Sequence, residues 1–462
     1  MPHDDRDVSA AVPSSTALPP TALPPTAAPQ DPAQSQALDK PSATPEVEAP
    51  PLRKVGKGYL LWLMIASFGS SLALMVPLSY SLAVRIDDLA SGHDERLGYV
   101  TGSAQVVYLV LSPLIGLWSD RTRSRLGRRT PFMFGGALLG TAALVGVALA
   151  PSVLLLGLAW VIGMIGWSTA GQAIQNIQAD RVPDEQRGRI SALTSVMTQI
   201  APVIGIGLAY AVASSTFLVF LVPGVLGAAL VVLFPVLKPE GDSRSLVHTS
   251  GVTLKGMVAS YGFNPRKYPD FGWNWLGRFV FFMGLYFNTT FGTFFYAQRL
   301  DLPVKEVAGI VAVIGTIGVV AAAGGAIGGG FLSDKLGRRK LFALIGSSVF
   351  VAGAVTEAFA RSLPQLVVGA VLMQFAIAVF SAVDQAIVFA VLPDRAEAGR
   401  YLAVVGFAQK IPSAVAPLIA PLVITLGVGP GGEKNYTQLY LLGAVLALVG
   451  GLIVKFKIRS VR

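Results

Sequence analysis

The chain has 462 residues, of which 53% are hydrophobic and only 13% are charged, and it carries a formal net charge of +10. Soluble domains carry about 25% charged residues, so this composition excludes an ordinary soluble protein and indicates a membrane protein. The excess of Lys and Arg could suggest nucleic-acid binding, but these residues lie in short segments between apolar runs, where they set membrane topology, and no nucleic-acid partner is expected.

Residues 1–52 form a tail that holds twelve of the 30 prolines, with Ala, Ser and Thr between them. This composition buries too little apolar surface to fold by itself and predicts a disordered tail. The tail lacks the basic start and apolar stretch of a cleavable signal peptide. The first membrane helix is therefore expected to direct insertion into the bilayer.

Twelve later segments are long and apolar enough to cross a bilayer as helices. The predicted spans are 58–84, 98–119, 130–150, 153–178, 190–213, 215–237, 271–297, 305–332, 340–360, 363–392, 401–426 and 436–456. They divide into an N-terminal half, 53–237, and a C-terminal half, 271–462, joined by a polar loop, 238–270. Leu246 to Tyr261 in that loop predicts a short surface helix. The sequence thus predicts an all-α membrane protein.

The distribution of basic residues predicts the orientation of the chain. Loops that follow even-numbered spans are rich in Lys and Arg, whereas the first loop on the other side, with Asp87, Asp88, Asp94 and Glu95, is acidic. Basic loops remain on the cytoplasmic side. Both termini are therefore expected in the cytoplasm, and the chain is expected to be a multi-pass protein of the plasma (inner) membrane.

One charged loop occurs twice. Gly116-Leu-Trp-Ser-Asp-Arg-Thr-Arg-Ser-Arg-Leu-Gly-Arg-Arg129 lies between the second and third spans, and Gly330-Phe-Leu-Ser-Asp-Lys-Leu-Gly-Arg-Arg339 lies between the eighth and ninth. The offset is 214 residues before the four-residue insertion Thr122 to Arg125 and 210 after it. Other matches, such as Arg85 with Arg299 and Gln175 with Gln385, keep these offsets. The two halves are therefore parallel repeats, an architecture of secondary transporters whose substrate site lies between the halves.

These loops resemble the signature of the major facilitator superfamily, Gly-x-x-x-Asp-(Arg/Lys)-x-Gly-Arg-(Arg/Lys). The longer first copy, up to Phe132, is similar to the sucrose-transporter-like branch, near the glycoside–pentoside–hexuronide cation symporters. The resemblance covers about residues 58–456. It implies the twelve-helix fold of that superfamily and a sugar or glycoside carried with a proton or sodium ion. The fourth-span positions that hold Asp and Arg in plant members hold Met164 and Gln175 here, so coupling residues are not carried over.

The twin loops are expected to form a gate. An Asp at a helix end accepts hydrogen bonds from free N–H groups at a neighbouring helix start. By resemblance, Asp120 faces the start of the eleventh span and Asp334 the start of the fifth when the cytoplasmic side is closed. Arg128 and Arg129 are expected to pair with Asp180. The gating residues are therefore Asp120, Arg128, Arg129, Asp180, Asp334, Arg338 and Arg339, with topology alone as the alternative role of the arginines.

Charges inside the membrane are costly and usually functional. Asp384 in the tenth span and Lys410 in the eleventh lie at similar depth, so we expect them to form the coupling or binding pair, which a proton or a substrate can switch, with a structural ion pair as the alternative. Glu357 and Arg361, four residues apart, are interpreted as an interfacial pair. Arg278 either extends to the cytoplasm or reaches a cavity.

Neutral polar residues inside the spans predict the substrate. Amides donate and accept hydrogen bonds, and beside aromatic faces they suit hydroxyl-rich ligands such as sugars; they also suit helix packing. The expected substrate-binding residues are Gln172, Gln175, Asn176, Gln199, Asn288, Gln385 and Gln409. The aromatic run from Phe287 to Tyr296 is interpreted as packing.

No enzyme motif is found. The chain lacks the Gly-x-x-x-x-Gly-Lys-(Ser/Thr) loop of ATP hydrolases, contains no cysteine, and has its three histidines outside the apolar runs. We therefore expect no catalysis, metal or cofactor. The predicted function is proton-coupled uptake of a sugar or glycoside by alternating access, in a protein that works as a monomer in the bilayer. A proton-driven exporter of a drug or metabolite, and a non-transporting membrane sensor, are the alternatives.

Overall fold

The computed structural model describes residues 54–244, 262–394, 397–429 and 432–461, and within these ranges the regular elements are all helices. They belong to one compact unit, Leu52–Arg462. The predicted tail, 1–52, and the predicted surface helix, Leu246 to Tyr261, lie outside the described residues. The helical fold confirms the all-α prediction.

The N-terminal half contains six spans. Their elements are α1 (Lys57–Val76), the π-helix η1 (Pro77–Ser81) and α2 (Leu82–Leu89), then α3 (Glu95–Arg121), α4 (Thr130–Leu149), α5 (Val153–Arg181), α6 (Asp184–Ala211) and α7 (Thr216–Leu237). The irregular turn η1 starts at a proline, which lacks an N–H and cannot continue regular α-helical hydrogen bonding. Ser152 and Ser215 cap α5 and α7 through their side-chain oxygens.

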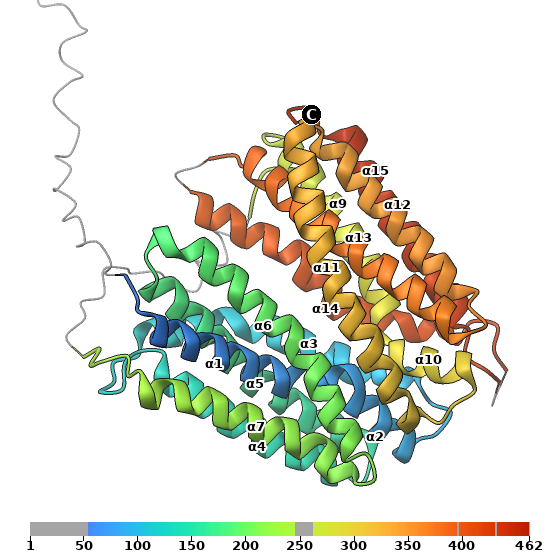
Figure 1. The fold of residues 1–462 in the computed structure, drawn as a ribbon, viewed down its shortest axis with the longest axis horizontal. Coiled ribbons are helices and arrows are strands. Elements are labelled where there is room, and N and C mark those ends of the chain that lie inside the picture. The colour runs from blue at the N-terminus through green and yellow to red at the C-terminus, as the bar shows by residue number, and fades with distance from the viewer. Residues whose placement is uncertain (1–53, 245–261, 395–396, 430–431, 462) are drawn as a thin grey trace, which may run out of the picture. The chain divides into compact units, whose positions relative to one another are not determined.

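The C-terminal half repeats this order. Its elements are α9 (Pro269–Thr290), α10 (Gly292–Leu300), the short 3₁₀ helix η2 (Val304–Val307), α11 (Ala308–Leu336), α12 (Arg339–Ala358), α13 (Leu363–Ala390), α14 (Ala398–Ile424) and α15 (Tyr436–Lys457). Every predicted span is thus occupied by helix, with ends that differ from the prediction by a few residues. Figure 1 shows the two sets of helices.

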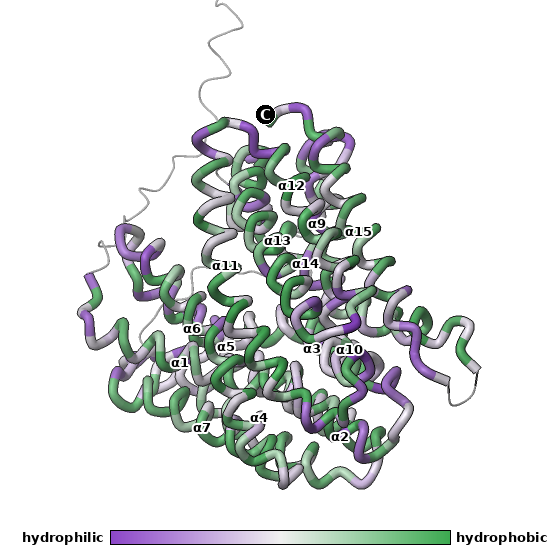
Figure 2. The backbone as a smooth tube through the Cα atoms, turned by 45° about the vertical axis from the view of Figure 1, so that its right-hand side comes forward, coloured by the Kyte–Doolittle hydropathy of each residue, from purple (hydrophilic) through white to green (hydrophobic). Residues whose placement is uncertain are grey.

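Eleven of the described helices are long and apolar enough to cross a membrane. Figure 2 shows hydrophobic residues along the helices and hydrophilic residues gathered at their ends. The remaining predicted span, 271–297, is formed by α9 and α10, and the 22 residues of α9 alone cover about 33 Å. α9 carries Arg278 and Asn288 and packs against α15 and α14, so protein neighbours rather than lipid surround its polar groups.

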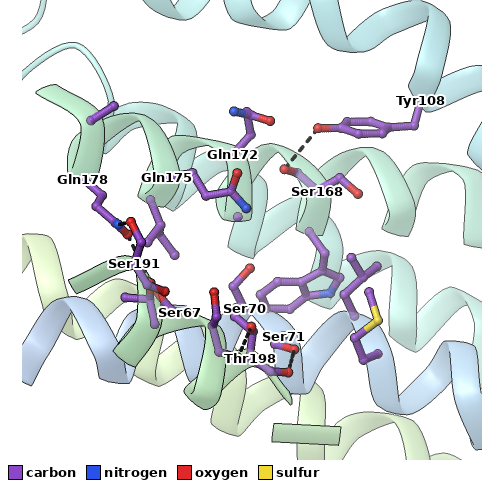
Figure 3. A pocket seen from close by; sticks show the side chains of 18 of the residues that line it. Ser67, Ser70, Ser71, Tyr108, Ser168, Gln172, Gln175, Gln178, Ser191 and Thr198 are labelled. Carbon is purple, nitrogen blue, oxygen red and sulfur yellow. Dashed lines mark hydrogen bonds between the residues drawn. The ribbon is translucent and has the colours of Figure 1, made fainter. Parts of the chain in front are cut away.

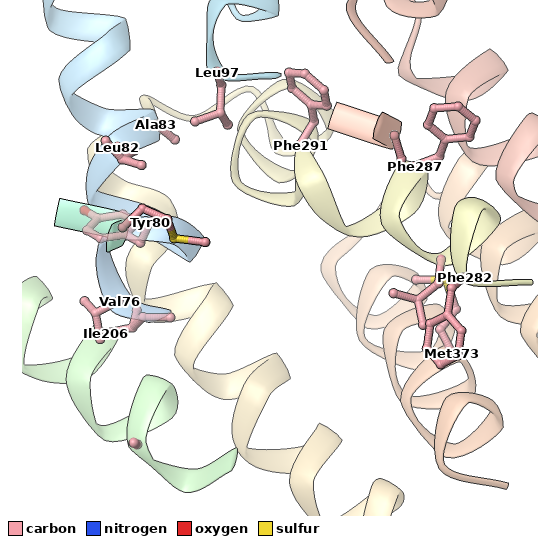
Figure 4. Packing of buried hydrophobic residues seen from close by; sticks show 14 of the residues in the cluster. Val76, Tyr80, Leu82, Ala83, Leu97, Ile206, Phe282, Phe287, Phe291 and Met373 are labelled. Atoms are coloured by element: carbon pink, nitrogen blue, oxygen red, sulfur yellow. The ribbon is translucent and has the colours of Figure 1, made fainter. Parts of the chain in front are cut away.

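The two halves meet through equivalent helices. α3 packs on α14, and its repeat partner α11 packs on α6. Buried hydrophobic residues from both halves form the core, among them Val76, Ile206, Phe282 and Met373 (Figure 4). The four phenylalanines of the run from Phe287 to Tyr296 are also buried, which fits their interpretation as packing.

The internal symmetry is visible in one contact. The Thr293 hydroxyl donates to the carbonyl oxygen of Ser79 at 2.6 Å, and these residues are 214 positions apart, the offset of the sequence repeat. Residue 77, where η1 begins, corresponds by the same offset to Phe291, the non-helical residue between α9 and α10. The first span of each half is therefore interrupted at equivalent positions, by η1 in one half and by Phe291 in the other. The two halves contact each other beside these interruptions.

Candidate functional site

A cavity of about 750 Å³ lies among α1, α3, α5 and α6, with Lys410 of α14 also on its wall (Figure 3). Its volume falls in the range of roughly 300–1,000 Å³ that is usual for ligand pockets. Hydroxyl and amide groups dominate its polar lining. These residues are Ser67, Ser70, Ser71, Tyr108, Ser168, Gln172, Gln175, Gln178, Ser191, Thr194, Ser195 and Thr198.

Helical spacing brings these groups to the cavity. Ser67, Ser70 and Ser71 of α1 are three and four residues apart, and Ser191, Thr194, Ser195 and Thr198 of α6 repeat that spacing. Residues with this spacing share one face of a helix. The sequence prediction did not include either set, although the same periodicity that identified the polar face of α5 could have found both.

Hydrogen bonds fix part of the lining. The Tyr108 hydroxyl donates to the carbonyl oxygen of Ser168 at 3.2 Å, and the Ser71 hydroxyl donates to that of Thr198 at 2.7 Å. On α5, the Gln172 amide donates to Asn176 Oδ1 at 3.0 Å. Figure 3 shows the side chains of Gln172 and Gln175 pointing into the space between the helices.

A second cavity, of about 570 Å³, shares part of this wall and extends it toward the C-terminal half. Leu74, Met75, Tyr108 and Ser168 line both cavities. The C-terminal half contributes polar groups of α9, α10, α13 and α14, namely Tyr286, Asn288, Thr289, Thr290, Thr293, Tyr296, Gln374 and Ser413. The two cavities together place a polar region between the halves, where a solute can contact both.

The predicted substrate residues fall into three groups. Gln172, Gln175 and Asn288 line the cavities, and Asn176 is bonded to Gln172. Gln409 accepts a hydrogen bond from Arg278 at 3.4 Å and so belongs to a charged cluster. Gln199 and Gln385 are exposed and are not among the residues that line either cavity. The structure thus brings together only part of the set.

The expected pairing of Asp384 with Lys410 is wrong. The carboxylate of Asp384 pairs with Arg278 of α9, and it is fully buried. Its second oxygen, Oδ1, has no hydrogen-bond partner among the described residues. Asp384 and Lys410 lie at equal depth, but this did not make them partners. The direction of each side chain depends on its position around the helix axis. Arg278 is only 12% exposed and turns inward instead of extending to the cytoplasm.

Lys410 has a different environment from the one expected. It lies on the wall of the larger cavity, beside residues of the N-terminal half. Arg187 lines the same cavity, and none of the described lining residues is Asp or Glu. The described lining of the larger cavity therefore includes two basic side chains, whereas the Arg278–Asp384 pair is neutral overall.

The first copy of the repeated loop forms the expected network with α5. Arg128 pairs with Asp180 at 2.7 Å, and Arg129 contacts Asp180 at 3.1 Å and Asp120 at 2.6 Å. Arg129 is 6% exposed and also donates to Ser119. These contacts confirm the predicted pairing of both arginines with Asp180.

Glu240, which the sequence prediction missed, completes this network. Its carboxylate accepts from the backbone N–H groups of Arg129 at 2.8 Å and Thr130 at 3.0 Å, at the start of α4. A carboxylate satisfies free donors and the positive dipole at a helix start. The chain segment after α7 thereby holds the backbone beside Arg129.

The second copy of the loop is simpler. Arg339 pairs with Asp334 at 2.9 Å and donates to the carbonyl oxygen of Ala386 at 3.4 Å, while Arg338 directly precedes α12. Ala390 stands at the repeat position of Asp180. Asp120 and Asp334 both bind within their own loops here, so the expected contacts with the starts of α14 and α6 stay a prediction for the arrangement with that side closed.

Polar contacts between the halves gather at the end where α2 and α10 lie, which the basic-residue distribution predicts to face outside; we call this the expected outer end (Figure 1). Lys305 pairs with Asp88 at 2.8 Å, and Lys434 pairs with Glu95 at 2.8 Å. The Tyr436 hydroxyl donates to Asp94 at 2.6 Å. Burial raises the pKa of Asp94, against the opposing effect of that hydrogen bond. The halves are therefore closed together at this end.

The interpretation of Glu357 as an interfacial partner of Arg361 is also wrong. Glu357 is fully buried, and its Oε1 accepts a hydrogen bond from the Tyr296 hydroxyl at 3.3 Å. α12 ends at Ala358, so Arg361 lies beyond the helix, where the geometry of residues four apart no longer holds.

Comparisons with known proteins agree with this architecture. The model of the Major Facilitator Superfamily matches residues 58–329 and 318–461. A stretch of 103 residues is 32% identical to the general alpha-glucoside permease of Schizosaccharomyces pombe and, equally, to the sucrose transport protein SUT4 of Oryza sativa subsp. indica. That stretch is 21% of this chain and covers only 17% and 16% of those two relatives.

Two solved structures share the fold. A bacterial homolog of the human lysosomal transporter Spinster, in an inward-facing and unoccupied conformation, matches with a TM-score of 0.67 and 18% identity over 88% of this chain and 98% of that one. The nucleoside transporter NupG matches with a TM-score of 0.65 and 13% identity over 86% of this chain and 100% of that one. At these identities the likeness shows the fold alone.

Proposed function

The chain belongs to the Major Facilitator Superfamily, and we propose that it takes up a sugar or glycoside together with a proton by alternating access. The observation that carries this proposal is the hydroxyl- and amide-rich lining of the larger cavity, with Gln172, Gln175 and Gln178 on one wall. Amide and hydroxyl groups both donate and accept, as sugar hydroxyls require. The short matches to a glucoside permease and a sucrose transport protein support the same substrate class.

The arrangement of the halves fits one state of an alternating-access cycle. With both termini in the cytoplasm, the contacts of Lys305 and Lys434 with the first outer loop close the outside, and we assign this arrangement to an inward-facing state. In the opposite state these contacts break, and the twin loops, through Asp120 and Asp334, close the cytoplasmic side. We place this cycle in the plasma membrane, with the monomer as the transporting unit.

Coupling to a proton requires a titratable group, such as a carboxyl group, whose protonation depends on the state of the carrier. Asp384 remains a candidate, with Arg278 in place of Lys410 as its partner. Gln409 links Arg278 to α14, the helix that also carries Lys410 at the larger cavity. Substrate binding at Lys410 in the larger cavity can therefore affect the Arg278–Asp384 pair through α14.

The test is uptake of radiolabelled sucrose and maltose by cells that express the protein, with and without a protonophore. We expect accumulation that the protonophore abolishes. Absence of uptake, together with lowered accumulation of a fluorescent cationic dye, would instead establish the exporter. The apolar side chains of Met75, Met164 and Ile377 on the smaller cavity are the feature that makes this second outcome worth measuring.

A matched pair of variants tests the cavity itself. Gln175 and Gln385 are repeat equivalents, but only Gln175 lines the cavity. One lost hydrogen bond costs about 0.5–1.5 kcal/mol, so Gln175→Ala is expected to weaken the apparent affinity by roughly 2- to 10-fold. Gln385→Ala is expected to have a smaller effect, and equal effects would contradict the assignment of the cavity.

A further inference from the structure

Glu357 occupies a polar site that the proposed transport path does not use. The residue is fully buried near the C-terminal end of α12. Its Oε1 accepts a hydrogen bond from Tyr296 of α10, and its Oε2 has no hydrogen-bond partner among the described residues. Tyr440 of α15 faces the same carboxyl group, and on α13 the neighbour is Gly369.

The charge of Glu357 is not balanced by a neighbouring cation. Arg299 on α10 is the basic residue beside the site, but its guanidinium donates to the carbonyl oxygen of Ala358 at 2.6 Å and to Thr437. Within the described part of the chain, no ion pair with Glu357 is formed. An ionised carboxylate buried without a cation is strongly disfavoured and takes up a proton instead. This arrangement therefore favours the neutral, protonated side chain over the carboxylate.

The fold does not require an acid at this position. At the repeat offset of 210, Glu357 corresponds to Val147, and at the offset of 214, Tyr296 corresponds to Leu82; both N-terminal counterparts are fully buried. Arg299 and its counterpart Arg85 are alike, because Arg85 donates to the carbonyl oxygen of Ala150. The repeat thus keeps the structural arginine and adds the carboxyl–tyrosine pair in one half only.

α10 connects this site to the part of the molecule that moves in the proposed cycle. Phe291 separates α10 from α9 and is not helical. Thr293 of α10 binds the backbone of Ser79 in the other half, and Tyr296 lines the smaller central cavity. One short helix therefore contacts Glu357, the opposite half and the cavity.

We propose that Glu357 is a proton-binding site that couples protonation to closure of the outer side, acting through Tyr296 and α10. The inference rests on the orientation and cycle of the proposed function. When the halves separate at the outer end, α10 shifts and water reaches the carboxylate, which can ionise. A proton from outside then binds a carboxylate oxygen, the neutral side chain is buried again, and α10 returns to its contact with Ser79.

The proton leaves on the other side of the cycle. Tyr296 contacts both places, because its hydroxyl donates to the carboxyl group and its side chain is among those that line the smaller cavity. The Tyr296 hydroxyl turns to give its own proton to water in the cavity and accepts the carboxyl proton in exchange. This step regenerates the carboxylate, which the closed site disfavours. The ionised carboxylate thus promotes reopening toward the outside. Proton entry and exit occur on opposite sides of the membrane, as a symporter requires.

The test measures the outer opening directly and does not depend on a known substrate. The chain has no cysteine, so spin labels can be attached at Ser91→Cys and Gly429→Cys, which lie in exposed outer loops of the two halves. Pulsed electron paramagnetic resonance then gives the distance distribution of the purified protein in nanodiscs from about pH 5 to about pH 9, a range that covers both exposed and buried carboxyl groups. A background with His93→Gln and Asp94→Asn removes two of the titratable groups beside the outer contacts, while Asp87, Asp88 and Glu95 are the same in every variant that is compared.

In this background we expect the long-distance population to rise at least about fivefold with pH, the lower range of allosteric couplings. Glu357→Gln mimics the neutral side chain and is expected to stay closed at every pH. Glu306→Gln, an exposed acid at the same end, is the matched control and is expected to keep the pH response. A response that persists in Glu357→Gln, or that Glu306→Gln removes equally, overturns the proposal.

Tyr296→Phe provides a second variant that retains the ring. Loss of the hydroxyl is expected to move the midpoint of the pH response and to slow proton-driven sucrose uptake more than exchange of labelled for unlabelled sucrose. An unchanged midpoint would overturn the proposal that Glu357 acts on α10 through the Tyr296 hydroxyl. If neither the unsubstituted protein nor its variants transport sucrose or maltose, the proposal of a sugar substrate is refuted. The distance measurements still decide the role of Glu357, because they need no substrate.

Discussion

The contact of α3 with α14 at the expected outer end allows a direct test of the closed arrangement. A Cβ added at Gly98 would lie 2.2 Å from the carbonyl oxygen of Pro417, 2.8 Å from Cγ of Pro421 and 2.9 Å from Phe291. Ordinary contacts begin at 3.4 Å, so the shortest approach is about 1 Å too close. A backbone oxygen and a proline ring cannot rotate away. In Gly98→Ala the two helices must therefore separate.

The cost of this change shifts the conformational equilibrium. Overpacking of this kind costs about 1–3 kcal/mol, which corresponds to roughly a 5- to 150-fold change in population. Because the close approach belongs to the arrangement with the outer end closed, Gly98→Ala is expected to favour an open outer end. Spin labels at Ser91→Cys and Gly429→Cys should show a larger long-distance population.

A matched substitution separates this effect from general damage. Gly207 lies in α6, and a Cβ added there meets nothing within 4 Å, so Gly207→Ala should leave the distance distribution unchanged. An unaltered distribution in Gly98→Ala, or an equal change in Gly207→Ala, would refute the argument from packing. Thermal unfolding of both proteins in detergent checks that they remain folded.

Three further substitutions test the charged groups. Asp384→Asn leaves Arg278 buried without its partner and is expected to lower the free energy of unfolding by about 3–5 kcal/mol. Adding Arg278→Gln should recover part of this loss, as measured by thermal unfolding in detergent. A double variant that is no more stable than Asp384→Asn would contradict the pairing. Because burial raises the pKa of Asp94, acidification favours the closed expected outer end, and this contribution is lost as the pH rises through the raised pKa. Asp94→Asn should therefore flatten that part of the curve of spin-label distance against pH. An unchanged curve would exclude Asp94 as a source of the pH dependence. Arg129→Gln removes the contacts with Asp180 and is expected to change the transport rate at an unchanged amount of protein in the membrane, whereas an unaltered rate would argue for a role in topology only.

The fold followed from the sequence because membrane physics constrains each segment separately. A segment of about 20 apolar residues must satisfy its backbone hydrogen bonds internally in lipid, so each predicted span became a helix without reference to its neighbours. The repeated loops then related the halves. The pairing of Arg128 and Arg129 with Asp180 could be predicted in the same local way, because these residues lie at adjoining helix ends.

Part of the cavity could also have been found from the sequence. The serines of α1 and the hydroxyl residues of α6 have the spacing of one helix face. Glu357 likewise continues a tightly packed face, since Gly346, Phe350 and Gly353 precede it at intervals of four and three residues and are buried with it. That pattern indicates an inward direction for the carboxyl group.

The partners of buried charges were decided only by the tertiary structure. Depth along a helix follows from residue count, and this placed Asp384 and Lys410 at the same level. Direction around the helix and the choice among several neighbouring helices do not follow from the count, and here they joined Asp384 to Arg278 and turned Lys410 to the cavity. The sequence by itself determined the helices, their order and their duplication, because these depend on local hydropathy and repetition. The tertiary structure decided which side chains meet, because that depends on how the helices pack.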